Sequence, residues 1–593
     1  MTSIRSWSDR GQQPADIRKT MKWARHDMAF DSSCGFPGQP GDSAAISGGS
    51  VRAAFDATSD RYPAHPFLHI PAQATAGYGG QAVDWEYGEA ALRVQALEAD
   101  FREAGLTRGH RVAVMLDNRA EFFLCWLALN GIGVSIVPLN AEHSAAEMAH
   151  VLRDSAAVMV VTLEGRRAAL EPALHLALAG TDRALPPVCC LGDDAPRVPV
   201  LPGTFAASTD ECALVYTSGS TGLPKGCMLS NAYMLAFGRW YLSLGGLCAI
   251  EPGAERLITP LPLVHMNALA CSSMAMILSG GCIIQLDRFH PGTWAQTVAQ
   301  SGATIVHYLG VMPAILLQFP PQPGDRAHAV KFGFGAGVHP KHQAAFEARF
   351  GFPLVESWSM TEVGAGAAVA ANVEPRHAGS RCFGRPSGHM EYRIVDDAGV
   401  DVPPGSSGEL WVRAAGPDPR AGFFSGYANQ PELTEAAWAG DYFHTGDIVR
   451  AGSDGALHFV DRKKSIIRRS GENIASLEVE AVLNQLPVVR NVGVGPVEDE
   501  TRGEEVMACV ELAAGHAPSH EVALQIFEAA AQRLAYYKLP GYIAFVSALP
   551  LTASQKLQRG VLREIMRRLA GEGAAFDLRA LKKRSASHPA DNA

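Results

Sequence analysis

Residues 217–226 read TSGSTGLPKG, and they follow the apolar run CALVY at 212–216. Glycines let backbone N–H groups approach an anion closely, hydroxyl side chains add further donors, and Lys225 supplies a positive charge. The stretch is not a Walker A motif, because two residues separate Gly222 from the lysine and a glycine follows it. A phosphate site and a solvent-exposed turn both fit these ten residues taken alone.

The sequence around this loop alternates between strand-like and helix-like segments. Helical spacing at 87–105 precedes the strand-like HRVAVML at 110–116, and the apolar run at 121–133 predicts a buried helix. Strands that alternate with helices indicate parallel sheets covered on both faces. The regular pattern begins near residue 83, and further strand-like runs lie at 134–140, 157–162, 255–265, 281–287, 303–310, 330–337 and 352–359.

The pattern changes twice further along the chain. Residues 384–413 read as strands joined by turns, which predicts a small barrel or sandwich. Beyond the basic segment near residue 461 the pattern is typical of a compact α+β domain, with helices expected at 475–485, 520–537 and about 557–569. The sequence therefore predicts an α/β protein with a large N-terminal domain, a small β-barrel-like subdomain and a small, mobile α+β C-terminal domain.

These patterns give the expected domain boundaries. The first 50 residues and the last 23 are polar and aperiodic, so we expect disorder there. The expected parts are a disordered extension at 1–50, a large domain at 51–461, a hinge at 462–466, a small domain at 467–570 and a disordered tail at 571–593.

Composition excludes several classes of protein. A chain of 593 residues with 47% hydrophobic and 19% charged residues has material for two or more soluble domains. Its net charge of −9 gives no basic surface, which makes nucleic acid an improbable partner. The eleven cysteines form no paired zinc spacing and are typical of buried side chains in a reducing compartment.

The chain also shows no sequence of a secreted or membrane-spanning protein. Its amino terminus lacks the apolar segment of a secretory signal. The most apolar stretch, at 269–286, contains three serines and two glycines and predicts a helix, a turn and a strand rather than a membrane span. We expect a cytoplasmic protein without a transmembrane segment, as a monomer or homodimer.

Six further motifs follow the 217–226 loop in a fixed order, and together they resolve its ambiguity. They are PLPLVHMNAL at 260–269, FGAGV at 334–338, ESWSMTE at 356–362, YFHTGD at 442–447, DRKKSIIRRSGENI at 461–474 and PLTASQKLQ at 550–558. The series resembles the adenylate-forming superfamily of acyl- and aryl-CoA synthetases, luciferases and peptide-synthetase adenylation domains, from about residue 83 to residue 569. Such enzymes use ATP to convert a carboxylate to an acyl-adenylate, release pyrophosphate, and in most cases pass the acyl group to a thiol.

The resemblance implies a phosphate and metal site. The loop would hold the β- and γ-phosphates, Thr361 would meet the α-phosphate, and Glu362 would bind Mg²⁺, a cation that prefers oxygen ligands. Taken alone, Glu362 would be a solvated surface carboxylate. The loop residues concerned are Thr217, Ser218, Gly219, Ser220, Thr221, Gly222 and Lys225.

The resemblance also implies an adenosine site. Asp447 would accept hydrogen bonds from both ribose hydroxyls, Arg462 would reach the same ribose, and Trp358 stands where the family usually has a tyrosine that stacks on adenine. The remaining pocket residues would be Gly335, Ala336, Gly337, Glu356 and Ser357.

The small domain would contribute Lys556, which the resemblance delivers to the α-phosphate and the attacking carboxylate, where it would stabilise the charge of the transition state. Two residues depart from the family pattern. Gln555 replaces the glycine before this lysine, and Ser359 replaces a glycine beside the acyl carbonyl.

Three residues would serve the second half-reaction. His265 stands where relatives have a gate between the carboxylate site and the pantetheine tunnel, although a lone histidine is commonly a packed core residue. Lys464 would be the hinge about which the small domain rotates, against the alternative of a solvated basic linker. Gly471 would leave room for the pantetheine arm, because it has no Cβ.

The sequence therefore predicts an ATP- and Mg²⁺-dependent carboxylate–CoA ligase acting on an acyl or aryl acid without a free amine, in the manner of enzymes of fatty acid metabolism. Two alternatives remain open at this stage. One is an acyl-AMP ligase that loads a carrier protein, and the other is a non-catalytic nucleotide-binding relative.

Overall fold

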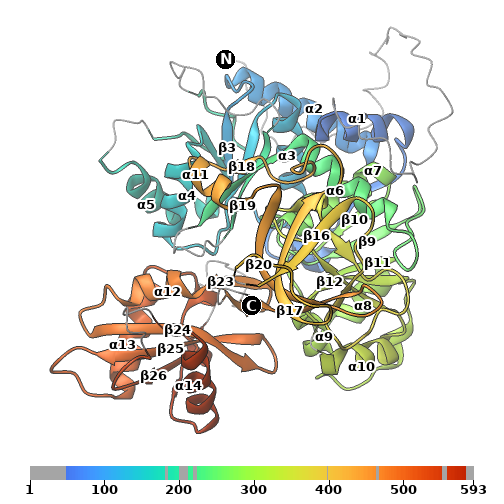
Figure 1. Cartoon of the computed structure of the whole chain (residues 1–593). Helices are drawn as coiled ribbons and strands as arrows, with labels where there is room; N and C mark the ends of the chain where they lie inside the picture. Colours follow the sequence, from blue (N-terminus) through green and yellow to red (C-terminus); the bar gives the residue numbers. More distant parts are fainter. Residues whose placement is uncertain are drawn as a thin grey trace.

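The computed structural model describes residues 49–180, 185–198, 211–217, 224–338, 340–396, 398–462, 466–550, 557 and 559–582. These residues form a large domain up to residue 462 and a small domain from residue 466, drawn in orange to red in Figure 1. The predicted extension at 1–50 lies almost wholly outside the described residues. Regular secondary structure starts earlier than the alternation near residue 83 suggests, with helix α1 (Val51–Arg61). Ser50 caps this helix, because its hydroxyl oxygen accepts a hydrogen bond from the Ala53 amide.

The first sheet of the large domain has eight strands in the order β14-β13-β12-β11-β9-β10-β1-β2. Its six central strands are parallel, and the outermost strand on each side is antiparallel to its neighbour. Their bounds are β1 (Pro66–Ile70), β2 (Val83–Glu86), β9 (Arg256–Thr259), β10 (Cys282–Gln285), β11 (Ile305–Leu309), β12 (Phe332–Ala336), β13 (Leu354–Trp358) and β14 (Val369–Ala370).

The second sheet has seven strands in the order β18-β8-β7-β4-β3-β5-β6. Strands β7 and β8 form an antiparallel hairpin at one side of a parallel group, and the 217–226 loop joins them. Their bounds are β3 (Arg111–Val114), β4 (Ser135–Pro138), β5 (Met159–Thr162), β6 (Val188–Cys190), β7 (Glu211–Thr217), β8 (Lys225–Ser230) and β18 (Gly426–Tyr427).

Helices cover both faces of the second sheet, as the alternation of the sequence predicts. On β3, Val112 and Val114 belong to the main core, whereas Ala113 faces a separate cluster with helices α4 and α5. Helix α3 lies in the main core and is apolar on all sides, which is typical of a fully buried helix. The large-domain helices not yet given are α2 (Tyr87–Glu103), α3 (Ala120–Gly131), α4 (Ala145–Ser155), α5 (Arg167–Leu178), α6 (Asn231–Ser243), α7 (Ser273–Ser279), α8 (Trp294–Gln300), α9 (Val311–Leu316), α10 (Pro340–Phe350) and α11 (Pro431–Ala436), with a π-helical turn at Asn267–Ser272.

The segment expected to form a barrel or sandwich is an antiparallel sheet in the order β15-β21-β20-β17-β16, with β19 beside β20. This sheet confirms the predicted β-barrel-like subdomain of the large domain. The strands are β15 (Cys382–Gly384), β16 (Met390–Val395), β17 (Ser407–Ala414), β19 (Trp438–Ala439), β20 (Tyr442–Ala451) and β21 (Leu457–Arg462).

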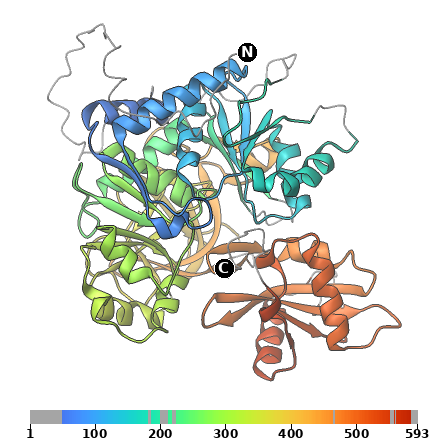
Figure 2. The ribbon, with the colours of Figure 1, turned by 180° about the vertical axis from the view of Figure 1, so that it is seen from behind.

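The small domain is a sheet with helices on both faces, in agreement with the α+β prediction. On β25, Val506, Ala508 and Val510 pack with α12 and α13, while Met507 and Cys509 pack with α14 on the other face. Helices α12 and α14 therefore lie on opposite faces of this sheet, and the small domain stands below the large domain in Figures 1 and 2. The elements are β22 (Ile466–Arg469), β23 (Glu472–Ala475), α12 (Ser476–Leu483), β24 (Val489–Asp499), β25 (Gly503–Leu512), α13 (His520–Ala531), β26 (Tyr542–Phe545), α14 (Arg559–Gly571) and β27 (Phe576–Asp577).

The predicted disordered tail at 571–593 is wrong for residues 571–582. Strand β27 pairs with β26, and Phe576 packs on Phe545 with ring centroids 5.7 Å apart. Lys582 then buries its ammonium against the Glu505 carboxylate at 2.5 Å. Because the segment is mostly polar, its sequence does not predict this order, which comes from an edge strand, the burial of Leu578 in the small-domain core and the ion pair of Lys582.

Across the described ranges, no helix combines the length and hydropathy that a membrane crossing requires.

Candidate active site

The carboxyl ends of the parallel strands β12 and β13 form the floor of the site. Glu356 on β13 is buried, and its carboxylate accepts hydrogen bonds from the Tyr308 hydroxyl at 2.9 Å and from the amides of Gly337 at 2.9 Å and Val338 at 3.2 Å. Burial raises the pKa of Glu356 to about 7, although these three donors act in the opposite direction. Glu356 therefore fixes the turn that follows β12.

The FGAGV segment needs its glycines at this turn. Gly337 has a φ of +85°, and a Cβ on Gly335 would lie 2.2 Å from the Tyr308 carbonyl oxygen. Ser357 donates a hydrogen bond to the Gly335 carbonyl at 3.1 Å, which ties β13 to β12. Ala336 and Gly337 are exposed at the end of β12, as residues that contact a ligand would be.

Trp358 and Asp447 meet between the first sheet and the antiparallel sheet. The indole Nε1 of Trp358 donates a hydrogen bond to Oδ2 of Asp447 at 2.8 Å, and both side chains are buried. Strands β20 and β21 pair Asp447 with Arg462 directly across the ladder. The structure thus brings together the three residues predicted for the adenosine site: Trp358 meets Asp447 through its side chain, and Arg462 is the backbone partner of Asp447 on the neighbouring strand.

Glu362 lies in a second group, with the buried Tyr427 and the half-buried Lys225. The Tyr427 hydroxyl donates to Oε1 of Glu362 at 2.9 Å, and the Lys225 ammonium lies 5.0 Å from the centre of the Tyr427 ring. The Thr361 carbonyl accepts a hydrogen bond from the Tyr233 hydroxyl at 3.0 Å. Tyr427 therefore connects the predicted metal ligand to the lysine of the phosphate loop.

The phosphate loop itself is only partly described. Thr217 and Lys225 are cross-strand neighbours where the β7–β8 hairpin opens. Ser218, Gly219, Ser220, Thr221 and Gly222 lie outside the described residues, as do Lys464 and Lys556, so their predicted roles stay predictions.

The small domain reaches the large domain through the loop after β22. Oε2 of Glu472 lies 3.7 Å from Nε2 of His265, and a Cβ on Gly471 would lie 2.1 Å from Cδ1 of Leu309. Burial alone would lower the pKa of His265, but the Glu472 carboxylate outweighs it and raises this pKa. Gly471 and His265, both predicted for the second half-reaction, thus lie at the same contact.

Leu557, next to the predicted catalytic lysine, packs in a different place. It lies against the cluster formed by Leu549, Leu562 and Met566, under α14. Arg563 and Arg567 of helix α14 line a small cavity together with Arg381 and Val460 of the large domain. The small domain therefore places its Gly471 loop, and not Leu557, at the contact with His265 and Leu309.

The segments expected to line an acyl pocket converge around Phe334. The rings of Tyr241 and His307 lie 4.4 and 5.4 Å from that of Phe334, and Trp240 lies 6.3 Å from it. Tyr241, Ser272 and Asn267 all hydrogen-bond to His307, and burial lowers the pKa of His307 to about 3. The cluster is therefore aromatic and uncharged at neutral pH.

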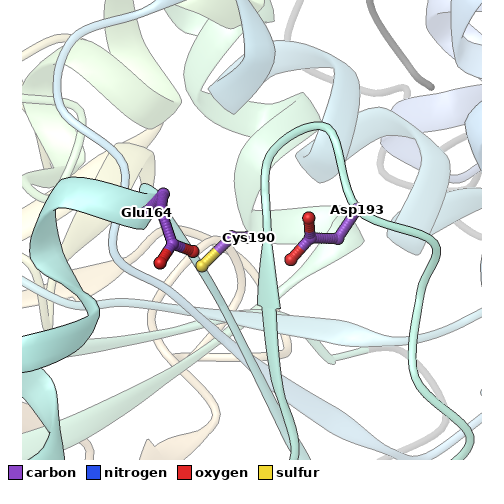
Figure 3. A group of neighbouring side chains, drawn as sticks. All are labelled: Glu164, Cys190 and Asp193. Carbon is purple, nitrogen blue, oxygen red and sulfur yellow. The ribbon is translucent and has the colours of Figure 1, made fainter.

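A group of potential metal ligands lies at the opposite edge of the second sheet, on and beside strand β6. Figure 3 shows the side chains of Glu164, Cys190 and Asp193 converging. Arg167 already pairs with both carboxylates, at 3.2 and 3.4 Å. Burial, helped by Glu164, raises the pKa of the Cys190 thiol to about 11, and a protonated thiol is a poor metal ligand. Ion pairing accounts for this cluster.

A surface cavity of about 540 Å³ lies beside β8 and β18. Its lining includes Arg111, Asp154 and Arg420, and each of these groups has a protein partner: Arg111 binds Glu211, Asp154 accepts from Tyr216, and Arg420 binds Glu435. The charges that line this cavity are therefore satisfied within the protein.

Sequence reasoning missed two residues of the site. Tyr427 lies in the segment FFSGYANQPELT, where an aromatic residue directly after a glycine was the available signal. Glu472 lies within the motif DRKKSIIRRSGENI, but nothing in the sequence indicates that it faces His265 across a domain boundary.

Comparisons with known proteins identify the family of the chain. The AMP-binding enzyme family matches residues 55–428, and the AMP-binding enzyme C-terminal domain matches residues 478–556. The chain belongs to the AMP-binding enzyme family, within the adenylate-forming superfamily. It is an AMP-forming ligase of the acid–thiol class.

Individual relatives resemble the chain over most of its length. The crotonobetaine/carnitine–CoA ligase of Citrobacter koseri is 29% identical over 77% of this chain and 89% of its own. The sulfoacetate–CoA ligase of Cupriavidus necator is 30% identical over 86% of this chain and 95% of its own. Among solved structures, the amide bond synthetase McbA of Marinactinospora thermotolerans has a TM-score of 0.72 and 26% identity, and the match covers 87% of this chain and 99% of that one.

Proposed function

We propose that the protein is an ATP- and Mg²⁺-dependent carboxylate–CoA ligase. It would activate an acyl or aryl acid as the acyl-adenylate with release of pyrophosphate, and then transfer the acyl group to CoA. One observation carries the proposal: the Gly471–Glu472 loop of the small domain lies against His265 and Leu309, where the resemblance expects a thiol to enter. Two relatives matched over most of the chain are CoA ligases, which supports the same acceptor.

The first half-reaction needs the adenosine and phosphate groups held together. Asp447 is fixed by the Trp358 indole, so its carboxylate is already oriented for two ribose hydroxyls. The ring of Trp358 offers a flat face for adenine, and Lys225 brings positive charge to the phosphates. Lys556, from the small domain in a different arrangement, would stabilise the charge that develops as the carboxylate attacks the α-phosphate.

Glu362 has the chemistry of a Mg²⁺ ligand. It is buried, and within the described part of the chain the Tyr427 hydroxyl occupies Oε1, so Oε2 remains to meet a hard cation. Bound Mg²⁺ would neutralise phosphate charge during adenylate transfer. The Tyr427 hydroxyl would orient the Glu362 carboxylate for this role, because it donates a hydrogen bond to Oε1.

The second half-reaction would use the arrangement that the structure shows. With the Gly471 loop against Leu309, no side chain projects from position 471 into the approach to His265. Attack of the CoA sulfur on the acyl carbon would form the thioester and expel AMP, and the thiol proton would leave to solvent or a nearby base. Rotation about Lys464 would exchange this arrangement for the adenylating one.

The acid is proposed to be uncharged apart from its carboxylate. The segments around Phe334 present Trp240, Tyr241 and a neutral His307, while Arg239 of the same helix is exposed to solvent. No carboxylate stands among these side chains to hold an amine, which argues against an amino acid substrate.

The ten described cysteines are all buried and unpaired, which supports a reducing, cytoplasmic location.

The proposal is tested with the purified chain, ATP, Mg²⁺ and a panel of acids, with AMP, pyrophosphate and acyl products all measured. Formation of AMP together with a CoA thioester supports it. If the acyl-adenylate forms but reacts only with a holo-carrier protein or with an amine, that compound and not CoA is the acceptor. Transfer to an amine is the chemistry named for McbA. Release of ADP, or no consumption of ATP with any acid, would overturn it.

A further inference from the structure

The strongest contact between the two domains lies at the start of helix α4 in the large domain. The Lys538 ammonium is 2.6 Å from Oε1 of Glu147 and 2.7 Å from Oε1 of Glu478. All three side chains are more than nine-tenths buried. Glu147 belongs to the large domain, whereas Lys538 and Glu478 belong to the small domain, so one of the two ion pairs spans the boundary.

The helix cap of α4 holds Glu147 in position for this contact. Its Oε2 accepts the Ser144 amide at 2.7 Å, and its own amide donates to the Ser144 hydroxyl oxygen at 3.3 Å, which together form a capping box. The Ser144 hydroxyl donates in turn to the Arg533 carbonyl of the small domain at 2.6 Å. The cap is therefore complete within the large domain and simultaneously forms the docking point for the small one.

The charges of the group are unbalanced, because two carboxylates share one ammonium. Burial and the neighbouring Glu147 raise the pKa of Glu478 above its ordinary value despite Lys538. Burial acts in the same direction on Glu147, but Lys538 and His143 outweigh it and lower the pKa of Glu147. Oε2 of Glu478 is buried without a hydrogen-bond partner among the described residues, as expected for a carboxyl that readily holds a proton.

We propose that Glu147 is a positioning residue for thioester formation, which holds Lys538 and thereby keeps the Gly471–Glu472 loop beside His265 and Leu309. Its role in turnover rests on the proposed function. If the small domain rotates about the hinge, Lys538 keeps Glu478, which moves with it, and loses Glu147, which does not. The Glu147–Lys538 pair therefore stabilises one arrangement and not the other.

The substitution Glu147→Gln isolates this contact. Glutamine can also complete a capping box, so α4 keeps its cap while the charge across the boundary disappears. We expect the conversion of supplied acyl-AMP and CoA to thioester to slow by at least about tenfold, because one partner of a buried charge pair is removed. Pyrophosphate exchange, which reports adenylation, should keep its wild-type rate.

Two further variants make the test specific. The charge swap Glu147→Lys with Lys538→Glu restores opposite charges across the boundary and the net charge of the group, and it should recover part of the lost rate. Glu211→Gln is the matched control, because Glu211 is buried and ion-paired to Arg111 at 2.7 Å entirely within the large domain. This control should leave the ratio of the two half-reactions unchanged.

A measurement that needs no activity separates this proposal from the proposed function. The side chains of Gln318 and Thr501 meet across the boundary at 3.2 Å, away from the Lys538 group. Cysteines placed at both positions should be joined by a short bifunctional thiol reagent, and Glu147→Gln should reduce that yield about in proportion to the lost thioester rate. A wild-type protein that makes no thioester would refute the proposed function, whereas unchanged cross-linking, or equal loss of both half-reactions, would refute the role of Glu147.

The pH dependence of cross-linking follows from the groups at the boundary. From the large domain these are Glu147, His143 and His265, and from the small domain Glu472, Glu478, Tyr537 and Lys538. The pKa of Glu478 is raised in the docked arrangement, so docking is favoured while Glu478 holds its proton and weakens as the pH rises through that pKa. The raised pKa of His265 acts in the same direction, while burial lowers the pKa of His143 to about 4 and keeps it neutral near pH 7. Because thiol reactivity itself rises with pH, the informative quantity is the yield relative to that of Glu478→Gln at the same pH, and this ratio should fall with rising pH; identical profiles would refute the part assigned to Glu478.

Discussion

The indole nitrogen of Trp358 lies 2.8 Å from the carboxylate of Asp447, and this hydrogen bond joins strand β13 of the parallel sheet to strand β20 of the antiparallel sheet. Trp358→Phe keeps an aromatic face and removes only the donor. A buried hydrogen bond to a charged acceptor is worth about 1.5–3 kcal/mol, so the affinity for ATP should fall by about tenfold or more. Equilibrium ATP binding by calorimetry checks this, and unchanged affinity would show that Asp447 is oriented by other groups.

Tyr427 is expected to control the use of Mg²⁺. Tyr427→Phe removes the donor to Oε1 of Glu362 while leaving the ring beside Lys225. The Mg²⁺ concentration that gives half-maximal pyrophosphate exchange should rise by about tenfold, because the carboxylate loses a charge-assisted hydrogen bond. Tyr216→Phe is the control, since its hydroxyl binds the Asp154 carboxylate at 2.7 Å away from the site. A similar rise in both variants would contradict a specific role for Tyr427.

Gly471→Ala should impair thioester formation more than adenylation. A Cβ at this position would lie 2.1 Å from Cδ1 of Leu309, and the backbone φ of +90° adds strain of about 1–2 kcal/mol. Gly573→Ala imposes a similar backbone strain, at a φ of +66°, but its Cβ would meet open space. Rates of the two half-reactions, measured separately for both variants, distinguish backbone strain from contact with Leu309. Thioester formation should slow more than adenylation in Gly471→Ala but not in Gly573→Ala.

Glu356 gives a prediction for stability against pH. Its pKa is raised from 4.5 to about 7 in the folded protein, so the folded state retains the proton more tightly than the unfolded chain. The contribution of Glu356 to stability is therefore present below pH 4.5, decreases between about pH 4.5 and 7, and is constant above. The melting temperature of Glu356→Gln minus that of the wild type should rise over that interval and then level off. A difference that does not change with pH would show that the three hydrogen-bond donors keep Glu356 ionised throughout.

Much of the fold could be predicted because its signals are local. The alternation of apolar runs with helical spacing is sufficient to identify parallel sheets, and Val112 and Ala113 indeed face different helix layers. Helix α13 was expected to continue to residue 537 but ends at Ala531. The chain then turns so that Tyr537 joins the small-domain core and Lys538 pairs with Glu478, and helical spacing along the sequence does not reveal these tertiary contacts.

The residues of the candidate site also fall into those that local motifs indicate and those that only the tertiary structure reveals. Trp358, Glu362 and Asp447 could be assigned because each lies within an ordered motif, and the structure brings Trp358 and Asp447 into contact. The partners Tyr427 and Glu472 could not, because their roles depend on tertiary placement and carry no spacing that marks them. The order at Lys582 was missed for a related reason, since a lysine in a polar segment gives no sign of a buried carboxylate elsewhere.

The short strand β27 has a consequence for how the protein is made. Because β27 completes one edge of the small-domain sheet and Lys582 joins Arg469 in pairing with Glu505, the small domain lacks two of its structural groups until residues 576–582 have left the ribosome. The large domain has all its strands well before that point, and domains generally fold as units from the amino end during synthesis. A nascent chain stalled shortly before residue 576 would therefore carry a finished nucleotide-binding domain joined to an unfinished, protease-sensitive partner.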